Sequence, residues 1–141
     1  MYLTNIIIFG ISFVIECKNK LFLFTADCHS QDIVEGLNAC FENRKKFWYV
    51  DAPHHGSKDN KFKTLLEYCE EIENLVVSSN HKLHPSEDFL GVLEKDQRSK
   101  TPKIKKIYFN YETSQSKNFF DILGKPKNIF QNKSKVFFDV K

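Results

Sequence analysis

The sequence predicts a layered α/β protein, and three observations carry that prediction. Apolar runs rich in β-branched and aromatic residues recur along the chain and are typical of strands. After the opening runs, each one is followed by a segment with apolar residues at helical spacing. The resulting order is ββ-α-β-α-β-α-β-(α)-ββ. Strands that alternate with helices in this way indicate a layered α/β architecture.

The chain is expected to open with a hairpin. Its strands come from the β-rich residues 6–9 and 11–16 and the apolar residues 21–25, with a turn at 18–20. A helix is predicted next over residues 30–41, capped by Ser30 or Asp32. The later elements are strands at 47–50, 75–79 and 104–111, helices at 61–72, 85–93 and 118–123, and a closing hairpin from 128–131 and 135–140. We expect Pro85 at the first position of its helix, and Gly124 at the end of the last one.

Composition limits the class of protein. A chain of 141 residues with 41% hydrophobic and 28% charged residues is a globular domain or part of a larger one, not a disordered chain. The four cysteines show no C-x-x-C spacing, so they give no zinc-finger signal and suggest buried free thiols in a reducing compartment. The apolar N-terminus lacks a basic region and is interrupted by Asn5, so it is expected to be a strand and not a signal peptide or membrane span. We therefore expect a soluble cytoplasmic protein with no membrane partner.

Residues suited to chemistry follow two of the predicted strands. Asp27 ends one apolar run, where its carboxylate either bridges cations or caps the following helix. His54 and His55 follow another run, and adjacent histidines on a strand point to opposite faces. One of them is therefore expected to bind a metal and the other to support that ligand or contact substrate, unless the chain has already turned. Gly56 allows close approach of a ligand to the backbone, and Ser57 can donate a hydrogen bond to it.

A third chemical segment, His84-Pro85-Ser86, follows the strand predicted at 75–79. It opens a helix, and helix N-termini attract anions. There His84 can donate a proton to a leaving oxygen or hold a phosphate. The structural interpretation is equally open, with Ser86 and Glu87 as cap residues of the helix.

These segments together resemble the metallo-β-lactamase superfamily, most of all the metallohydrolase domains of ComEC-type DNA-uptake proteins. The resemblance is carried, in order along the chain, by Phe24-Thr25-Ala26-Asp27, Ala52-Pro53-His54-His55-Gly56-Ser57, Val77-Ser78-Ser79-Asn80 and His84-Pro85-Ser86. It covers residues 12–93, and residues 104–141 would be the closing strands of the family. The resemblance implies that residues 1–141 form a single partial domain. Its fold would be the C-terminal half of an αββα sandwich, a mixed sheet with flanking helices.

The resemblance also implies roles for individual residues. Asp27 matches the carboxylate that bridges two metals, and His54, or His55 in its place, matches a late histidine ligand. His84 matches a histidine that lines the site, so His84 and His55 are the expected catalytic residues. Ser57, Ser79 and Asn80 are the expected substrate contacts. In such enzymes two cations, zinc or manganese here, lower the pKa of a bridging water that attacks a phosphodiester or similar bond.

The chain also departs from the family pattern. Ala26 replaces the usual glycine before Asp27, and Phe9 stands where asparagine is usual. The H-x-H-x-D-H run that supplies most of the metal ligands is missing, because His29 is the first histidine. We therefore expect a fragment or subunit of a metal-dependent hydrolase, inactive alone, that lacks its N-terminal half or a partner chain. The uncovered apolar face of its sheet would then favour aggregation or pairing with that partner.

Two other interpretations remain at this stage. A non-catalytic, degenerate module could bind an anion or nucleic acid, and the basic stretch from Arg98 to Lys106 favours it. An unrelated α/β protein with coincidental motifs would instead hold Asp27 and His54 far apart in space.

Overall fold

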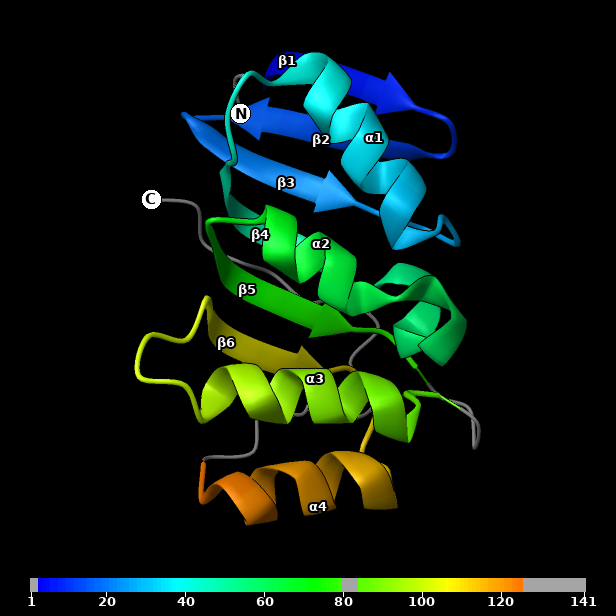
Figure 1. The fold of residues 1–141 in the computed structure, drawn as a ribbon, viewed down its shortest axis with the longest axis vertical. Helices are drawn as coiled ribbons and strands as arrows, with labels where there is room; N and C mark the ends of the chain where they lie inside the picture. Colours follow the sequence, from blue (N-terminus) through cyan, green and yellow to red (C-terminus); the bar gives the residue numbers. More distant parts are fainter. Residues whose placement is uncertain (1–2, 80–83, 126–141) are drawn as a thin grey trace.

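A six-stranded mixed sheet with four helices makes up the computed structural model, which describes residues 3–79 and 84–125 (Figure 1). The strands are β1 (Leu3–Phe9), β2 (Ser12–Cys17), β3 (Lys20–Phe24), β4 (Lys46–Asp51), β5 (Glu71–Val77) and β6 (Ile104–Phe109). The helices are α1 (Ser30–Cys40), α2 (Phe62–Tyr68), α3 (Glu87–Gln97) and α4 (Ser114–Leu123). Two short 3₁₀ turns, Pro53–Gly56 and Lys58–Asn60, lie between β4 and α2. The α/β class expected from the sequence is confirmed.

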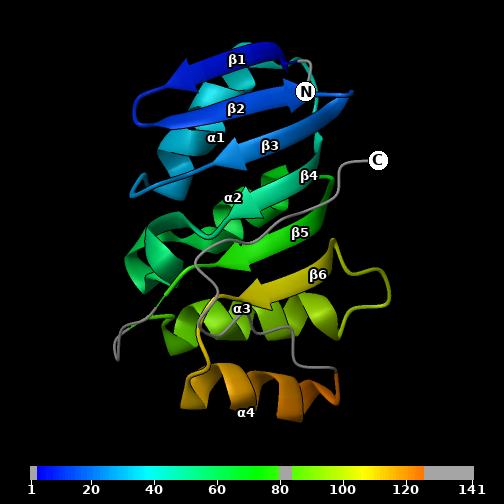
Figure 2. The same ribbon diagram turned by 180° about the vertical axis from the view of Figure 1, so that it is seen from behind.

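The strands lie in the order of the sequence, from β1 to β6. The first three are antiparallel neighbours, whereas β3 to β6 are parallel neighbours. Each parallel pair is joined through one helix, and such crossovers are almost always right-handed. Because the crossovers all advance in one direction along the sheet, α1, α2 and α3 cover the same face (Figures 1 and 2).

The core lies between this face and the helices. Strand pairing sets one row of side chains directly opposite one another, made up of Val14, Leu23, Val50, Leu75 and Ile107. All five are buried, as are Ile33, Leu37, Leu65 and Phe89 from the covering helices. This interdigitated apolar layer holds the helices, and with them the loops at both edges of the sheet, in fixed positions.

Alternate residues of the strands turn to the other face, which carries aromatic side chains. Phe22 lies opposite both Ile15 and Tyr49, and Phe13 lies opposite Phe24 with the ring centroids 4.8 Å apart. These side chains are only partly buried, and α1, α2 and α3 all lie on the far side of the sheet from them (Figure 2). Ile6 and Ile8 on β1 continue the apolar surface, with exposed fractions of 52% and 72%, and Ile11 in the turn after β1 is 63% exposed.

The opening segment and the helix expected over 61–72 differ from the structure. The opening is a three-stranded meander and not a hairpin, because Gly10 adopts a left-handed conformation (φ 64°) and lets the chain turn between β1 and β2. The helix expected over 61–72 ends at Tyr68, and β5 begins at Glu71. Ile72 lies in the sheet opposite Phe47 on one side and Ile104 on the other, and burial between two strands outweighs its helical spacing.

The helix starts also differ from those expected. His29, not Ser30 or Asp32, occupies the N-cap position of α1. Pro85 precedes the third helix, which begins at Glu87 because the Ser86 hydroxyl accepts a hydrogen bond from the Phe89 N–H at 3.2 Å.

The last described helix, α4, is longer than expected. It begins at Ser114, where Thr113 and Ser116 form a reciprocal capping box. Its end at Gly124, in a left-handed conformation, is confirmed. The closing hairpin expected at 128–131 and 135–140 lies outside the described residues. Within the described ranges, no helix is long and apolar enough to cross a membrane.

Candidate functional site

The residues singled out in the sequence meet at one edge of the sheet. Because β3, β4 and β5 are parallel, their carboxyl ends lie at the same edge. Asp27 follows the end of β3, His54 and His55 follow the end of β4, and His84 follows β5. The common edge is the expected location of a site in an open sheet of this kind.

A direct hydrogen bond joins the first two of these segments. The backbone N–H of His54 donates to the carbonyl oxygen of Ala26 at 2.8 Å, next to Asp27. The Asp27 side chain itself is exposed at this edge. The backbones of these two segments are therefore in contact, whereas the interpretation of coincidental motifs expected Asp27 and His54 to lie far apart.

Asp51, the last residue of β4, fixes the geometry between these segments. Its Oδ1 accepts a hydrogen bond from the Thr25 N–H at 2.6 Å, and the Thr25 hydroxyl lies 3.0 Å from both Oδ1 and the Asp51 carbonyl oxygen. Burial raises the pKa of the Asp51 carboxyl above its usual value of 3.8. The hydrogen bonds from Thr25 and Ala26 lower this pKa, but by less than burial raises it. Asp51 thus ties the end of β3 to the end of β4 and holds the turn that presents Asp27.

Both histidines of the Pro-His-His-Gly segment lie in a turn. The backbones of His54 and His55 adopt left-handed conformations, with φ of 45° and 58°. The strand has ended at Asp51, so the alternation of side chains along a strand does not govern them. Their ring centroids lie 6.2 Å apart, and each ring has its own partner.

The hydrogen bonds of these rings define their free nitrogens. The Asn60 amide nitrogen donates to the Cys28 carbonyl at 2.7 Å, so its Oδ1 faces His54 and accepts from the His54 Nδ1 at 3.3 Å. The His55 Nδ1 lies 2.5 Å from the Ser78 carbonyl oxygen, which can only accept. Both rings therefore carry their proton on Nδ1 and offer Nε2 as the basic nitrogen. A histidine ligand oriented by such a bond is common at metal sites, and this arrangement leaves both His54 and His55 suitable.

The third histidine lies beside the first. The ring centroids of His54 and His84 are 5.6 Å apart. The Ser79 hydroxyl donates to the His84 carbonyl oxygen, and the Ser79 N–H donates to the Asn110 side chain at 2.8 Å. Ser79 is buried and thereby links the end of β5 to the segment that carries His84.

The other two expected substrate contacts are less informative. Ser57 is buried, and its hydroxyl accepts a hydrogen bond from the Asp59 N–H at 3.3 Å. Its role as a substrate contact stays a prediction. Asn80 lies outside the described residues.

Gly56 packs the histidine turn against the start of α3. The Gly56 carbonyl oxygen accepts hydrogen bonds from the Ser86 N–H at 3.0 Å and from the Ser86 hydroxyl at 3.1 Å. A Cβ atom on Gly56 would lie 2.9 Å from both the Pro85 Cβ and the Phe89 ring. The two motif segments are thus in backbone contact, and only glycine fits between them.

We expect Ser86→Ala to lower the free energy of unfolding by about 1–2 kcal/mol, because α3 loses its cap and Gly56 loses one donor. Urea unfolding followed by circular dichroism would measure the change. Ser114→Ala is the matched control, because Ser114 is exposed at the first position of α4 and its loss should change stability by less than about 0.5 kcal/mol. Equal effects of the two substitutions would contradict this role for Ser86.

The metal ligands expected here do not form a complete set. Among residues 3–79 and 84–125, no three His, Cys, Asp or Glu side chains are grouped so that they could hold a metal ion. Asp27 and the imidazoles at this edge therefore fit only part of a metal centre.

Two residues that fix this edge were missed in the sequence. Asp51 stands one residue before the Ala-Pro-His-His motif, and Asn60 follows it. Asp51 ends an apolar strand as Asp27 does, and that parallel was a usable signal. Asn60 gave no such signal, because its two partners, His54 and Cys28, lie 6 and 32 residues away in the sequence.

Comparisons with protein-family models, curated proteins and solved structures found no match for this chain.

Proposed function

We propose that this chain is the C-terminal half of a metal-dependent hydrolase with the metallo-β-lactamase fold, acting as a fragment or subunit. The single observation that carries the proposal is the convergence of Asp27, His54 and His84 at one sheet edge, with Ala26 and His54 hydrogen-bonded at 2.8 Å. Motif order in the sequence agrees with that convergence. Asp27 and His54 would supply part of a two-metal centre of zinc or manganese.

The remaining ligands must then come from elsewhere. Within the described residues, the His, Cys, Asp and Glu side chains at this edge are not grouped in a set of three that could hold a metal ion. A missing N-terminal half or a partner chain would provide them. When bound, the metals would activate a water for attack on a phosphodiester, in nucleic acid or a smaller substrate. His54 and His55 would present Nε2, while Asn60 and the Ser78 carbonyl hold their rings.

Among the described residues, α1, α2 and α3 all cover one face of the sheet, and the apolar face that they leave supports a missing partner. Phe13, Phe22, Phe24 and Tyr49 form a connected aromatic surface on the side away from α1, α2 and α3. In an αββα sandwich this face packs against a second sheet. Exposed Ile6 and Ile8 on β1 extend the apolar surface to the edge of the sheet.

The alternative function, a module that binds nucleic acid without turnover, is less well supported. Its basic stretch is largely paired within the chain: Arg98 with Glu94 at 2.8 Å, Lys105 with Glu71 at 3.3 Å and Lys106 with Glu73 at 3.2 Å. The Lys103 ammonium donates to three backbone carbonyls, those of residues 66, 67 and 69. Little of this charge remains to attract phosphates.

The test is metal binding and hydrolysis by the isolated chain. Calorimetric titration with Zn²⁺ or Mn²⁺ should give at most one weakly bound metal per chain, since most ligands are missing. Hydrolysis of bis(p-nitrophenyl) phosphate should stay at or near background. Asp27→Ala and His54→Ala should each abolish the metal binding.

His29→Ala is the matched control for these variants, because His29 is an exposed imidazole close to Asp27 in the chain. It should bind metal as the wild type does. Two tightly bound metals with robust phosphodiesterase activity would refute the proposal that this chain is an inactive fragment. Metal binding that survives both Asp27→Ala and His54→Ala would refute the assignment of these two residues as metal ligands.

A further inference from the structure

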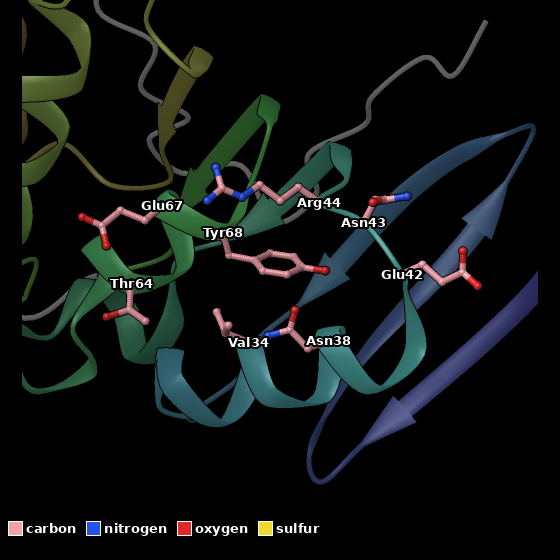
Figure 3. A pocket seen from close by; sticks show the side chains of 8 residues that line it. All are labelled: Val34, Asn38, Glu42, Asn43, Arg44, Thr64, Glu67 and Tyr68. Atoms are coloured by element: carbon pink, nitrogen blue, oxygen red, sulfur yellow. The ribbon is translucent and has the colours of Figure 1, made fainter.

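A cavity lies away from the motif residues. It has a volume of about 450 Å³ and opens between α1, α2 and the segment that leads into β4 (Figure 3). Its lining includes Arg44, two residues before β4 begins, and Tyr68, at the end of α2 just before β5. These positions lie at the amino ends of the parallel strands, at the opposite edge of the sheet from His54. The cavity is therefore independent of the proposed metal site.

The Tyr68 side chain is the feature of this cavity that indicates a bound ligand. Its ring extends from α2 into the space beside α1 (Figure 3), and only 8% of the residue is exposed. The hydroxyl is buried and has no hydrogen-bond partner among the described residues. Buried hydroxyls are almost always paired, so a group from outside the chain is the natural partner. Burial raises the pKa of Tyr68 above 10.0, which keeps the hydroxyl protonated and able to donate.

Further donors line the same cavity. Arg44 forms no ion pair within the described part of the chain, and its guanidinium lies on the side of the cavity where the Tyr68 side chain leaves α2 (Figure 3). Asn38 also lines the cavity from α1, with its amide oxygen turned toward Tyr68 and its amide nitrogen toward Val34 (Figure 3). The carboxylates that line the rim, Glu42 and Glu67, are directed outward, and Glu67 pairs with Lys63 at 3.6 Å.

From this arrangement we infer that the cavity binds a small anion through carboxylate or phosphate oxygens. A guanidinium offers paired donors that match such oxygens, and the tyrosine hydroxyl is a second donor that lines the same cavity. The volume suits a small molecule and not a polymer. Val34 and the Tyr68 ring supply an apolar wall for the remainder of the ligand.

The inference is tested by NMR titration of the ¹⁵N-labelled chain with sodium phosphate and, separately, with sodium acetate. Both titrations are run at low salt with a chelator present, so that metal binding at the other edge plays no part. We expect saturable shifts of the backbone amides around residues 38, 44 and 68. Saturation with phosphate alone identifies a phosphate ligand, saturation with acetate alone a carboxylate, and saturation with both a general oxyanion site.

Two variants separate a binding role from a structural one. Arg44→Gln should weaken binding about tenfold or more, because it removes a charge-assisted hydrogen bond. Tyr68→Phe should weaken binding severalfold without lowering the melting temperature of the ligand-free chain, because it removes a hydroxyl that has no partner. Arg98→Gln is the control and should bind normally, since Arg98 pairs with Glu94 on α3. Absence of saturable binding by either anion, or binding unchanged in Arg44→Gln, would overturn the inference.

Discussion

Replacing Gly56 by alanine is expected to lower the free energy of unfolding by about 3–5 kcal/mol. Gly56 has a φ of 80°, a conformation that an L side chain adopts only at a cost of about 1–2 kcal/mol. The added methyl group would also lie 2.9 Å from the Pro85 Cβ and the Phe89 ring. Neither neighbour can move easily, because Phe89 is a buried core residue packed on Phe62. The methyl group therefore forces the histidine turn and α3 apart.

Alanine substitutions at two other glycines separate the effects of backbone strain and of steric crowding on the free energy of unfolding. Gly10 also has a positive φ of 64° but no atom within 4 Å of an added Cβ, so Gly10→Ala should cost only about 1–2 kcal/mol. Gly91 lies on the exposed side of α3 with open space around it, and Gly91→Ala should stabilise the protein by about 0.5–1 kcal/mol. Chemical denaturation of the three variants gives the comparison. A Gly56→Ala protein no less stable than Gly10→Ala would show that the close approach of the two motifs is absent.

Removing the Asp51 carboxylate is expected to have the second large effect. Asp51→Ala should lower the free energy of unfolding by about 2–4 kcal/mol, because the Thr25 N–H and hydroxyl lose their acceptor where little water can replace it. Asp51→Asn keeps an oxygen acceptor in the same place and should be much less destabilising. Urea unfolding at neutral pH measures both variants, and equal losses in the two would contradict the role given to this acceptor.

Ionisation of the Asp51 carboxyl is also expected to make the stability of the protein depend on pH. Burial raises its pKa in the folded protein above the value of 3.8, so the folded state holds its proton more tightly than the unfolded state. Its contribution to stability is fully present below pH 3.8 and declines as the pH rises through the folded-state pKa. The difference in the free energy of unfolding between the wild type and Asp51→Asn should therefore fall as the pH rises from 3.8 through the folded-state pKa, and should then level off. A rise over the same range would mean that the hydrogen bonds outweigh burial.

Local patterns in the sequence were sufficient for much of the fold. Apolar runs and helical spacing predicted the alternation of strands and helices after the opening segment, and Gly124 predicted the end of α4. The positions of the chemical segments also predicted that Asp27, His54 and His84 each follow the end of a strand. These features follow from residues close together in the chain, for which spacing and turn chemistry are direct physical constraints.

Other features depended on contacts between distant residues. Whether Ile72 ends a helix or begins a strand was decided by Phe47 and Ile104, which flank it in the sheet. Which carboxylate became partly buried was decided by the pairing of Asp51 with Thr25, while Asp27 remained exposed.

The orientation of the histidines shows the same division. The sequence by itself determined that two adjacent imidazoles follow a strand at the carboxyl edge of the sheet. Only the tertiary structure decided that the chain has already turned there, and that Asn60 and the Ser78 carbonyl each fix one ring. Spacing along a chain limits what neighbouring residues can do, whereas hydrogen-bond partners 6 and 23 residues away are set by how the strands and helices pack.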